Sequence, residues 1–530
     1  MNRNNDLNRN NSDIKPAPGK ATPLLGAANK FSDTSTLSPR FGEAIVELPE
    51  GFIASLGDAC SVVDTDLQTR ASAGIDWWPL GAMWMLDEDE AARRLPSLPG
   101  VVARPSSAQE VADVLRLCTE RHVPITPIAG RSGVSGAALS LYGGVALDLC
   151  GLSGIVEVDD ISGIVEVRAG TFGAAFETEL RSSYDLTLGH WPQSMTISTV
   201  GGWLACRSAG QFSTRYGKIE DMVVGLEVAL ANGSLIHTGG WPRAAVGTDL
   251  TQLFVGSEGT LGVITSAQLV CHPLPSHEAR GAYGFVNFAA GIEACRKILR
   301  RGATPAVLRL YDPLESARNY KTDNQAVLLV LDEGDPAIVE ATMSIVEQEC
   351  EQGQRLDTEL VEQWMGHRND VSALESLLNK GWVVDTIEAS APWSVLPDLY
   401  RTMIEALESV EGMRAASAHL SHSYLDGACI YATFAALPQT SSMAERERCY
   451  IESWNAATRA IQNAGAALSH HHGIGRNRHR FMAESLGTGG LAVLNEIKAA
   501  LDPSGVLNPG KLGGVSRFGE LNWHKENTES

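Results

Sequence analysis

The sequence has little positive charge for its size. It contains 42 Lys and Arg residues against 63 Asp and Glu residues, and its formal net charge at pH 7 is −21. Binding to nucleic acid or to an anionic membrane surface draws on clustered Lys and Arg side chains. The charge balance therefore excludes nucleic acid as a partner. One short stretch, GRNRHR at residues 475–480, is strongly basic and suits an anionic small molecule.

The sequence also lacks the cysteine patterns of disulfide-rich and zinc-ribbon proteins. Its nine cysteines are scattered and odd in number, and no two have CxxC spacing, so a reducing compartment fits best. No apolar run is as long as a membrane span, and the polar N-terminus lacks the apolar centre of a signal peptide. The last residues, ENTES, carry no peroxisomal Ser-Lys-Leu signal. We therefore predict a cytoplasmic protein without a transmembrane segment, which leaves peripheral membrane contact open.

What the chain does have is length and apolar content. With 530 residues, of which 44% are hydrophobic, the chain is too long to fold around one ordinary hydrophobic core, so we expect two or more lobes. The alternation of strand and helix patterns predicts an α+β protein. Changes in composition divide it into a disordered tail (1–40), an N-terminal helical segment (41–94), a first domain (95–275), a cap-like second domain (276–465), a C-terminal segment that returns to the first domain (466–515) and a tail (516–530).

Local patterns predict individual elements in both domains. In the first domain we expect a helix at 108–120, strands at 123–128 and 145–149, and hairpins at 154–167 and 222–237, the second with a type I′ turn at Asn232 and Gly233. In the second we expect helices at 290–300, 337–352, 393–407 and 443–465, and strands at 325–331 and 428–434.

Three glycine-rich segments are candidate ligand loops. They are residues 127–136 (PIAGRSGVSG), 197–203 (ISTVGGW) and 256–265 (GSEGTLGVIT). The first is neither GxGxxG nor a Walker loop, which disfavours a nicotinamide or P-loop site. Glycine still lets backbone amides approach a pyrophosphate closely, although such a turn alone is also compatible with an ordinary surface loop.

Together with residues 216–224 (YGKIEDMVV), these segments resemble the flavin-binding domain of the vanillyl-alcohol oxidase family. The resemblance implies a two-lobe FAD-binding domain with an α+β cap. Some relatives attach the flavin to a histidine in the first loop, where this chain has Val134, so the resemblance implies non-covalent FAD. It assigns cofactor contacts to Pro127, Gly130, Arg131, Ser132, Gly133, Ser135, Gly136, Ser194, Ser198, Thr199, Gly202, Arg207, Ser208, Glu258, Thr260, Gly262 and Ile264.

Further motifs narrow the resemblance to the alkylglycerone-phosphate synthase (alkyldihydroxyacetonephosphate synthase) family. They occur in the family's order over about residues 95–512. They are LGHWPQS (188–194), STVGGW (198–203), PAVLRLYD (305–312), EASAPW (388–393), GACIY (427–431) and SHHHG (469–473). D-lactate and 2-hydroxyglutarate dehydrogenases share the flavin loops but carry Ser-Gly-Glu-His-Gly in place of SHHHG.

The three consecutive histidines raise the question of their chemistry. In an extended segment only alternate side chains, here His470 and His472, share a face, and the sequence places no Cys or acidic ligand pattern beside them. We therefore predict no metal site. Imidazole titrates near neutrality, which favours acid/base work over an incidental polar loop.

The resemblance supplies a specific reaction. It implies that the acyl group of an acyl dihydroxyacetone phosphate is exchanged for a fatty alcohol through a flavin N5 adduct, without net redox change, as in ether lipid synthesis. It places acid/base roles on His471 and Tyr431, with His470 and His472 as neighbours. Arg309 maps onto an active-site arginine, and Arg309, Arg476 and Tyr431 are expected to face an anionic, lipid-like substrate. A homodimer is the family's usual assembly.

Other interpretations stay open at this stage. The same loops and histidines suit an FAD-linked dehydrogenase or oxidase of a 2-hydroxy acid or alcohol, and a non-enzymatic binding protein is a third class. Tyr431 is also compatible with a core strand position, and Arg309 with a surface pair to Asp312.

Overall fold

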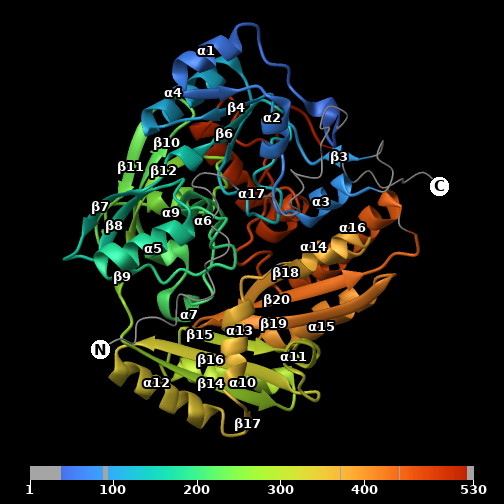
Figure 1. Ribbon diagram of the computed structural model, residues 1–530. Coiled ribbons are helices and arrows are strands. Elements are labelled where there is room, and N and C mark those ends of the chain that lie inside the picture. Colours follow the sequence, from blue (N-terminus) through green and yellow to red (C-terminus); the bar gives the residue numbers. More distant parts are fainter. Residues whose placement is uncertain (1–37, 88–92, 371, 441, 522–530) are drawn as a thin grey trace.

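The computed structural model describes residues 38–87, 93–370, 372–440 and 442–521 (Figure 1). Most of the expected N-terminal tail and the last nine residues lie outside this part of the chain. Three sheets dominate the described residues, with four, five and seven strands. Two short pairs accompany them, β1 (Ser38–Pro39) with β3 (Arg94–Leu95) and β9 (Leu186–Thr187) with β13 (His272–Pro273).

The four-stranded sheet contains the strand that leads into the first glycine loop. Its order is β2 (Val62–Asp64), β4 (Val101–Arg104), β6 (Val145–Asp148) and β5 (Ile125–Ile128), and the last three are parallel. Helix α4 (Ala108–Arg121) confirms the helix expected at 108–120. It begins where the Ser107 side chain caps the Glu110 amide, and it buries its apolar face with α1 (Phe52–Ala59) against this sheet.

The five-stranded sheet is antiparallel; the third glycine segment runs into its strand β12 (Val263–Val270), and the second runs into helix α6 (Val200–Cys206), which packs with it. The strand order is β11 (Leu235–Gly239), β10 (Val223–Ala229), β12, β8 (Ile164–Arg168) and β7 (Ile155–Asp159). Both predicted hairpins are present. Packed with the sheet are α5 (Gly173–Tyr184), α6, α7 (Ser213–Tyr216), α8 (Ile219–Met222) and α9 (Leu250–Phe254).

The predicted type I′ turn at Asn232 and Gly233 is wrong. Only Gly233 has a positive φ, of 82°, and its amide bonds the carbonyl of Leu230 while the Leu230 amide bonds Ser234. This is a three-residue loop in which a left-handed glycine follows an ordinary turn, so one positive φ is sufficient.

The seven-stranded antiparallel sheet forms the lower part of the molecule in Figure 1. Its order is β17 (Gln354–Arg355), β14 (His277–Phe285), β16 (Ala326–Gly334), β15 (Val307–Tyr311), β19 (Met413–Ser423), β20 (Gly427–Ala436) and β18 (Val383–Pro392). Sequence patterns predicted β16 and β20 but not the other strands. Around it lie α10 (Phe288–Arg300), α11 (Pro313–Tyr320), α12 (Pro336–Glu349), α13 (Glu359–His367), α14 (Ser372–Asn379), α15 (Leu396–Glu408) and α16 (Met443–Asn463).

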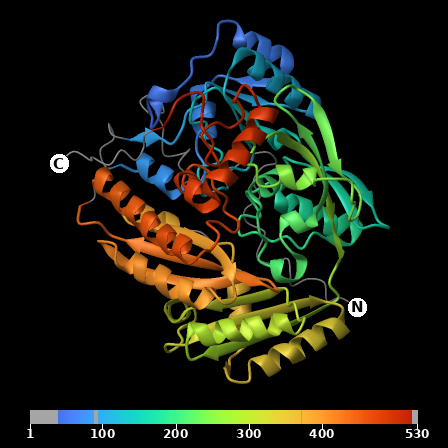
Figure 2. The same cartoon turned by 180° about the vertical axis from the view of Figure 1, so that it is seen from behind.

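Both faces of this sheet are covered. Along β16, Leu328 and Val330 join the core beneath α10, α12 and α15, while Leu329 and Leu331 join a second cluster with Trp364. The strand is therefore apolar throughout rather than alternating. In Figure 2 helices α10, α12 and α15 cover one face of the sheet, which leaves the opposite face toward the glycine loops.

The later part of the N-terminal helical segment packs into the core of the seven-stranded sheet. It contains α2 (Leu67–Ala73) and α3 (Pro79–Met85). Trp78 and Trp84 are only 0% and 2% exposed, and Trp78 Nε1 donates to the hydroxyl of Tyr450 on α16. These tryptophans therefore belong to the core.

The C-terminal residues contact both large parts of the molecule. Leu507 bridges Ile125 at the edge of the four-stranded sheet, and Ala467 bridges Ser390 on β18. Helix α17 (Met482–Leu501), red in Figures 1 and 2, lies among the blue and green elements, and Lys498 on it donates to the Thr260 carbonyl at 2.7 Å. Within the described ranges, every helix is too short or too polar to cross a bilayer.

Candidate active site

The histidine segment is an irregular loop held by one buried carboxylate, that of Glu388. Glu388, on β18, accepts bonds from the amides of His470 and His472 and from the hydroxyl of Ser469 at 2.7 Å. Arg478 Nη2 lies 3.3 Å from the same carboxylate. Burial is the largest single influence and opposes ionisation, but the charge of Arg478, the nearby His472 and the bonds from the loop together hold the pKa of Glu388 below its usual value. Glu388 thus holds the loop mainly through its backbone, so the imidazoles are available for other contacts.

The imidazoles of His470 and His471 bond to each other. Their Nδ1 atoms lie 3.0 Å apart, and His470 Nε2 lies 3.0 Å from the hydroxyl of Tyr424. Burial lowers the pKa of both rings well below the usual value, and it lowers that of His472 to about 4. All three are therefore neutral near pH 7, and each ring has one unprotonated nitrogen that can accept a hydrogen bond.

Tyr431 lies in strand β20 but faces the histidines rather than the core. Its ring stacks on His419 at a centroid distance of 4.8 Å and on His471 at 6.0 Å. Its hydroxyl donates to Thr386 at 3.0 Å, and burial raises the pKa of the phenol above its usual value. The phenol therefore keeps its proton, and its ring lies beside the imidazoles.

Arg309, on β15, belongs to the same cluster through His419. Its Nη2 lies 2.7 Å from His419 Nε2, and His419 Nδ1 lies 3.0 Å from Glu315. The surface pair between Arg309 and Asp312 is not formed: Asp312 caps α11 and accepts from the Ala418 amide at 2.6 Å. Among the described residues Arg309 has no carboxylate at ion-pair distance, so its charge is available to an anion.

Arg368 is a second cation that the sequence did not indicate. Its guanidinium lies over Trp191, Phe212 and Trp364, at 5.6, 5.2 and 5.7 Å from the ring centroids. Arg309 lies 5.9 Å from the same Trp364 ring. Within the described part of the chain Arg368 forms no ion pair, and burial lowers its pKa to about 10. No local motif marks this residue, because the aromatic rings come from separate elements.

His422 is a further imidazole that sequence reasoning missed. It sits at an irregularity of β19 between Ser421 and Ser423, with a left-handed φ of 54°, and is 7% exposed. Its ring lies 5.2 Å from His470 and 4.9 Å from His471. The only signal in the sequence is a polar Ser-His-Ser run inside a strand, and it gives no direction for the side chain.

The first glycine loop presents free amides. No backbone amide from Arg131 to Gly136 donates a hydrogen bond to another described residue. A Cβ on Gly130 would lie 2.1 Å from the carbonyl of Ile197, whereas a Cβ on Gly133 would meet nothing within 4 Å. The loop is therefore tightly seated at one end and open in the middle, as a cradle for the FAD pyrophosphate requires.

Several of the other residues assigned to the cofactor already have partners within the protein. Glu258 accepts from the amides of Ile474 and Gly475, and so ties the third glycine loop to the histidine segment. Ser135 Oγ donates to the His472 carbonyl at 3.1 Å. Most of the remaining assigned residues form hydrogen bonds that shape the backbone: Thr199 caps α6, Ser198 donates to Ser194 and accepts from Trp203, Thr260 donates to Ser257, Arg207 donates to Val255 beside Gly256, Ser208 donates to Trp203, and Arg131 donates to Ser72. The others are placed by packing: Pro127 lies against Gly259, Gly136 against Trp78 and Gly262 against Val228, and Ile264 is buried in β12.

Arg476 lies on a different side of the site. Its Nη2 donates to the carbonyl of Leu521 at 2.7 Å, and its Cβ lies 3.4 Å from the position of a Cβ on Gly136. No contact joins it to Arg309 or Tyr431 in the described ranges. The structure therefore places Arg476 beside the first glycine loop rather than with the other two residues.

A cysteine lies beside the histidines, contrary to the expectation from the sequence. The ligand atoms of Cys429, His470 and His471 lie within 4.8 Å of one another. It is His470 and His471, rather than His470 and His472, whose ring nitrogens meet. The contact between the two imidazoles accounts for the closeness of His470 and His471, and burial raises the pKa of the Cys429 thiol well above its usual value.

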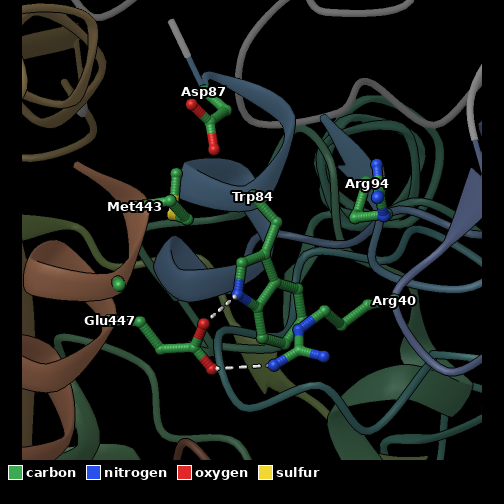
Figure 3. Close-up of a pocket in the computed structure, with 7 residues that line it drawn as sticks. Arg40, Trp84, Asp87, Arg94, Met443 and Glu447 are labelled. Carbon is green, nitrogen blue, oxygen red and sulfur yellow. Dashed lines mark hydrogen bonds and ion pairs between the residues drawn. The ribbon is translucent and has the colours of Figure 1, made fainter. Parts of the chain in front are cut away.

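A separate pocket of about 300 Å³ opens between the N-terminal segment and α16 (Figure 3). Its central groups already have partners: Glu447 accepts from Trp84 Nε1 at 3.2 Å and from Arg40 at 3.3 Å. None of the proposed site residues lines it. The lining residues are Arg40, Trp84, Asp87, Arg94, Met443, Ala444 and Glu447.

Comparison with known proteins agrees with this geometry. Residues 99–239 match the family "FAD binding domain", and residues 274–512 match "FAD linked oxidases, C-terminal domain". The chain is 30% identical over 433 residues to the uncharacterized FAD-linked oxidoreductase YgcU of Escherichia coli O157:H7, covering 78% of this chain and 89% of the relative.

Two other relatives represent different activities. The alkyldihydroxyacetonephosphate synthase of Dictyostelium discoideum is 28% identical over 462 residues, 79% of this chain and 74% of the relative. The glycolate oxidase subunit GlcD of Bacillus subtilis is 28% identical over 438 residues, which cover 80% of this chain and 91% of the relative. A solved alkyldihydroxyacetonephosphate synthase structure shares the fold, with a TM-score of 0.71 at 22% identity over 93% of this chain and 89% of that one.

Proposed function

The chain belongs to the FAD-linked oxidase family and is an FAD-dependent enzyme, and from this premise we propose that it acts as an alkyldihydroxyacetonephosphate synthase-type transferase. The proposed reaction exchanges the acyl group of an acyl dihydroxyacetone phosphate for a fatty alcohol. One arrangement carries the proposal: the neutral ring of His471, bonded through Nδ1, stacks beside Tyr431 next to a cation without a carboxylate partner, Arg309. An ether-lipid role and a cytoplasmic homodimer belong to the same proposal.

The residues of the chain account for the proton movements. Exchange of an ester oxygen for an alcohol oxygen releases a fatty acid as its carboxylate, so one proton from the alcohol must leave the site. His471 offers Nε2 as the base for that proton. Tyr431 keeps its proton, because burial raises its pKa, and by exchanging its bond to Thr386 it serves as a hydrogen-bond donor to a developing oxyanion. When bound, FAD supplies an electrophilic ring system that withdraws electron density from the reacting carbon.

The two arginines account for an anionic substrate. Arg309 and Arg368 both lie within 6 Å of the Trp364 ring and have no carboxylate partners among the described residues. Guanidinium groups match phosphate oxygens in geometry and charge. We assign the phosphate of the substrate to this pair, with the ester end directed toward His471.

A second function fits the same groups. The carboxylate of a 2-hydroxy acid would also bind the arginine pair, and His471 would take the proton of its hydroxyl group during oxidation. The names of two relatives, an FAD-linked oxidoreductase and a glycolate oxidase subunit, favour this alternative.

An anaerobic assay separates the two. The purified yellow protein is mixed with acyl dihydroxyacetone phosphate and a long-chain alcohol without an electron acceptor, and both the ether product and flavin absorbance are followed. Repeated ether formation with unchanged final absorbance supports the transferase. Absence of ether, with lasting bleaching when a 2-hydroxy acid is added, contradicts it and supports the oxidoreductase.

A further inference from the structure

A continuous series of hydrogen-bonding groups runs from His471 to His422. His471 Nδ1 lies 3.0 Å from His470 Nδ1, and His470 Nε2 lies 3.0 Å from the Tyr424 hydroxyl. The same hydroxyl lies 3.4 Å from Ser213 Oγ, which lies 2.8 Å from His422 Nδ1. The five side chains come from helix α7, strand β19 with its following residues, and the histidine loop.

Each link of this series can hold its proton in either of two ways. In the first setting His471 donates from Nδ1 to His470, His470 donates from Nε2 to Tyr424, Tyr424 donates to Ser213, and Ser213 donates to His422 Nδ1. His471 Nε2 is then bare, and His422 carries its proton on Nε2. In the second setting every one of these bonds is reversed, and all five groups are again neutral and bonded.

The surroundings favour passing a proton on rather than storing it. Burial lowers the pKa of His422, His470 and His471 well below the usual value, and the charge of Lys218, whose Nζ donates to the His470 carbonyl at 2.6 Å, acts in the same direction. An imidazolium at any of these positions is therefore costly. The left-handed backbone of His422 also turns its ring onto His470 and His471, and strained residues of this kind concentrate at functional sites.

We propose that His471, His470, Tyr424, Ser213 and His422 form a proton relay that carries the alcohol proton away from the reacting atoms. The proposal rests on the proposed function. The alcohol proton binds to His471 Nε2, and each group passes its own proton to the next. His422, which is 7% exposed and also bonds the Gly210 backbone, then releases one proton from Nε2 to water. One O–H bond of the alcohol breaks, one proton reaches solvent, and no charge or electron remains on the relay. Ser213, Tyr424 and His422 act as proton carriers and positioning residues, while His471 contacts the substrate.

The test compares FAD-loaded wild-type protein with Tyr424→Phe and Ser213→Ala in the anaerobic ether-forming assay. Each variant removes one hydroxyl and keeps the remaining shape. Tyr400→Phe is the control, because it removes a half-buried phenol on helix α15 that bonds Asp312 instead. We expect both relay variants to lower kcat at least about tenfold, with KM and FAD content unchanged. In mixtures of H2O and D2O the wild-type rate should follow a curved dependence on deuterium content, and the relay variants a linear one. Wild-type kcat and curvature in either variant would overturn the relay.

A second measurement needs no turnover. Ring-nitrogen resonances of 15N-labelled histidines report tautomers in the resting FAD-loaded protein. The relay predicts that Tyr424→Phe shifts the resonances of both His470 and His422, although the relay group that bonds His422 is Ser213 and not Tyr424. A change confined to His470 would overturn the relay. If wild-type protein forms no ether at all, the proposed function fails, and this measurement still decides the relay.

Discussion

Glu388 and Arg478 form an ion pair in which the side chains are 0% and 2% exposed, with Oε1 and Nη2 3.3 Å apart. The same carboxylate holds the amides of His470 and His472. A charged pair buried this deeply has to satisfy most of its hydrogen bonds, because desolvation otherwise exceeds the attraction. Glu388 does so with the histidine loop, which links the stability of this region to the placement of its imidazoles.

Glu388→Gln should therefore destabilise the protein and disorder the site. Removing one partner of a buried pair costs about 3–5 kcal/mol, because the other charge stays buried. We expect the free energy of unfolding, measured in urea, to fall by about that amount, and turnover to fall with it. Glu405→Gln is the control, since Glu405 pairs with Arg401 on the exposed face of α15 and should change stability little. Equal midpoints for the two variants would contradict the role of Glu388.

Acid should begin to destabilise the protein at a pH well above the range in which carboxylates usually titrate. Burial lowers the pKa of His472, His419 and His479 to about 4, and that of His190 to about 3, from an ordinary value of 6.5. Between these values the unfolded chain binds more protons than the folded one, so stability is full above about pH 6.5 and falls as the pH drops toward 4. Urea midpoints at pH 7.5 and pH 5 should differ markedly. Similar midpoints would mean that these histidines are solvated.

The open middle of the first glycine loop predicts a selective loss of cofactor. Gly133→Ala adds a methyl group that meets no protein atom within 4 Å, so folding should be unaffected. The methyl group would occupy space that a pyrophosphate approaches, and we expect the Kd for FAD, measured by fluorescence quenching, to rise at least about tenfold. Gly57→Ala, on the exposed face of α1, has equally open surroundings and should bind FAD normally. Retained affinity in Gly133→Ala would place the cofactor elsewhere.

Sequence patterns predicted the parts of the site whose geometry is local. The glycine loops could be located because close backbone approach restricts these positions to glycine, as the 2.1 Å contact at Gly130 shows. Tyr431 and Glu388 lie in motifs quoted from the sequence, although only the structure shows Glu388 holding the histidine loop. Strands β18 and β20 pair and bring these motifs together, but only β20 was predicted. Strand β18 is buried on both sides, so its sequence does not alternate between apolar and polar residues.

His422 and Arg368 could not be found in this way. The direction of His422 depends on a register shift in β19, and register is decided by the neighbouring strands. Arg368 is placed by Trp191, Phe212 and Trp364, which are far apart in the chain. The incorrect prediction of a type I′ turn at Asn232 has a local cause. The Asn-Gly rule holds for two-residue loops, and this loop has three residues.

The position of His471 predicts loss of turnover without loss of cofactor. His471→Ala removes the ring beside Tyr431 but no contact of the first glycine loop. We expect kcat to fall about 10²–10⁴-fold while FAD content stays constant, because a positioned base contributes on that order. His367→Ala, at an exposed position on α13, should behave as the wild type. An active His471→Ala protein would remove this residue from the mechanism.

Arg368 offers the sharpest test of the anion subsite. Its guanidinium lies among three aromatic rings and bonds only Gln211 and no carboxylate among the described residues, so its charge is not needed to neutralise a protein group. Arg368→Gln should therefore raise KM for the phosphate-bearing substrate about tenfold or more, since a hydrogen bond to a charged group contributes about 1.5–3 kcal/mol. The KM for the fatty alcohol, which carries no charge, should change little. Arg401→Gln, on the exposed face of α15, is the control for loss of a surface charge. If Arg368→Gln raised both KM values equally, the substitution would be acting through packing, whereas a selective effect on the anion assigns the phosphate to the Trp364 arginine pair.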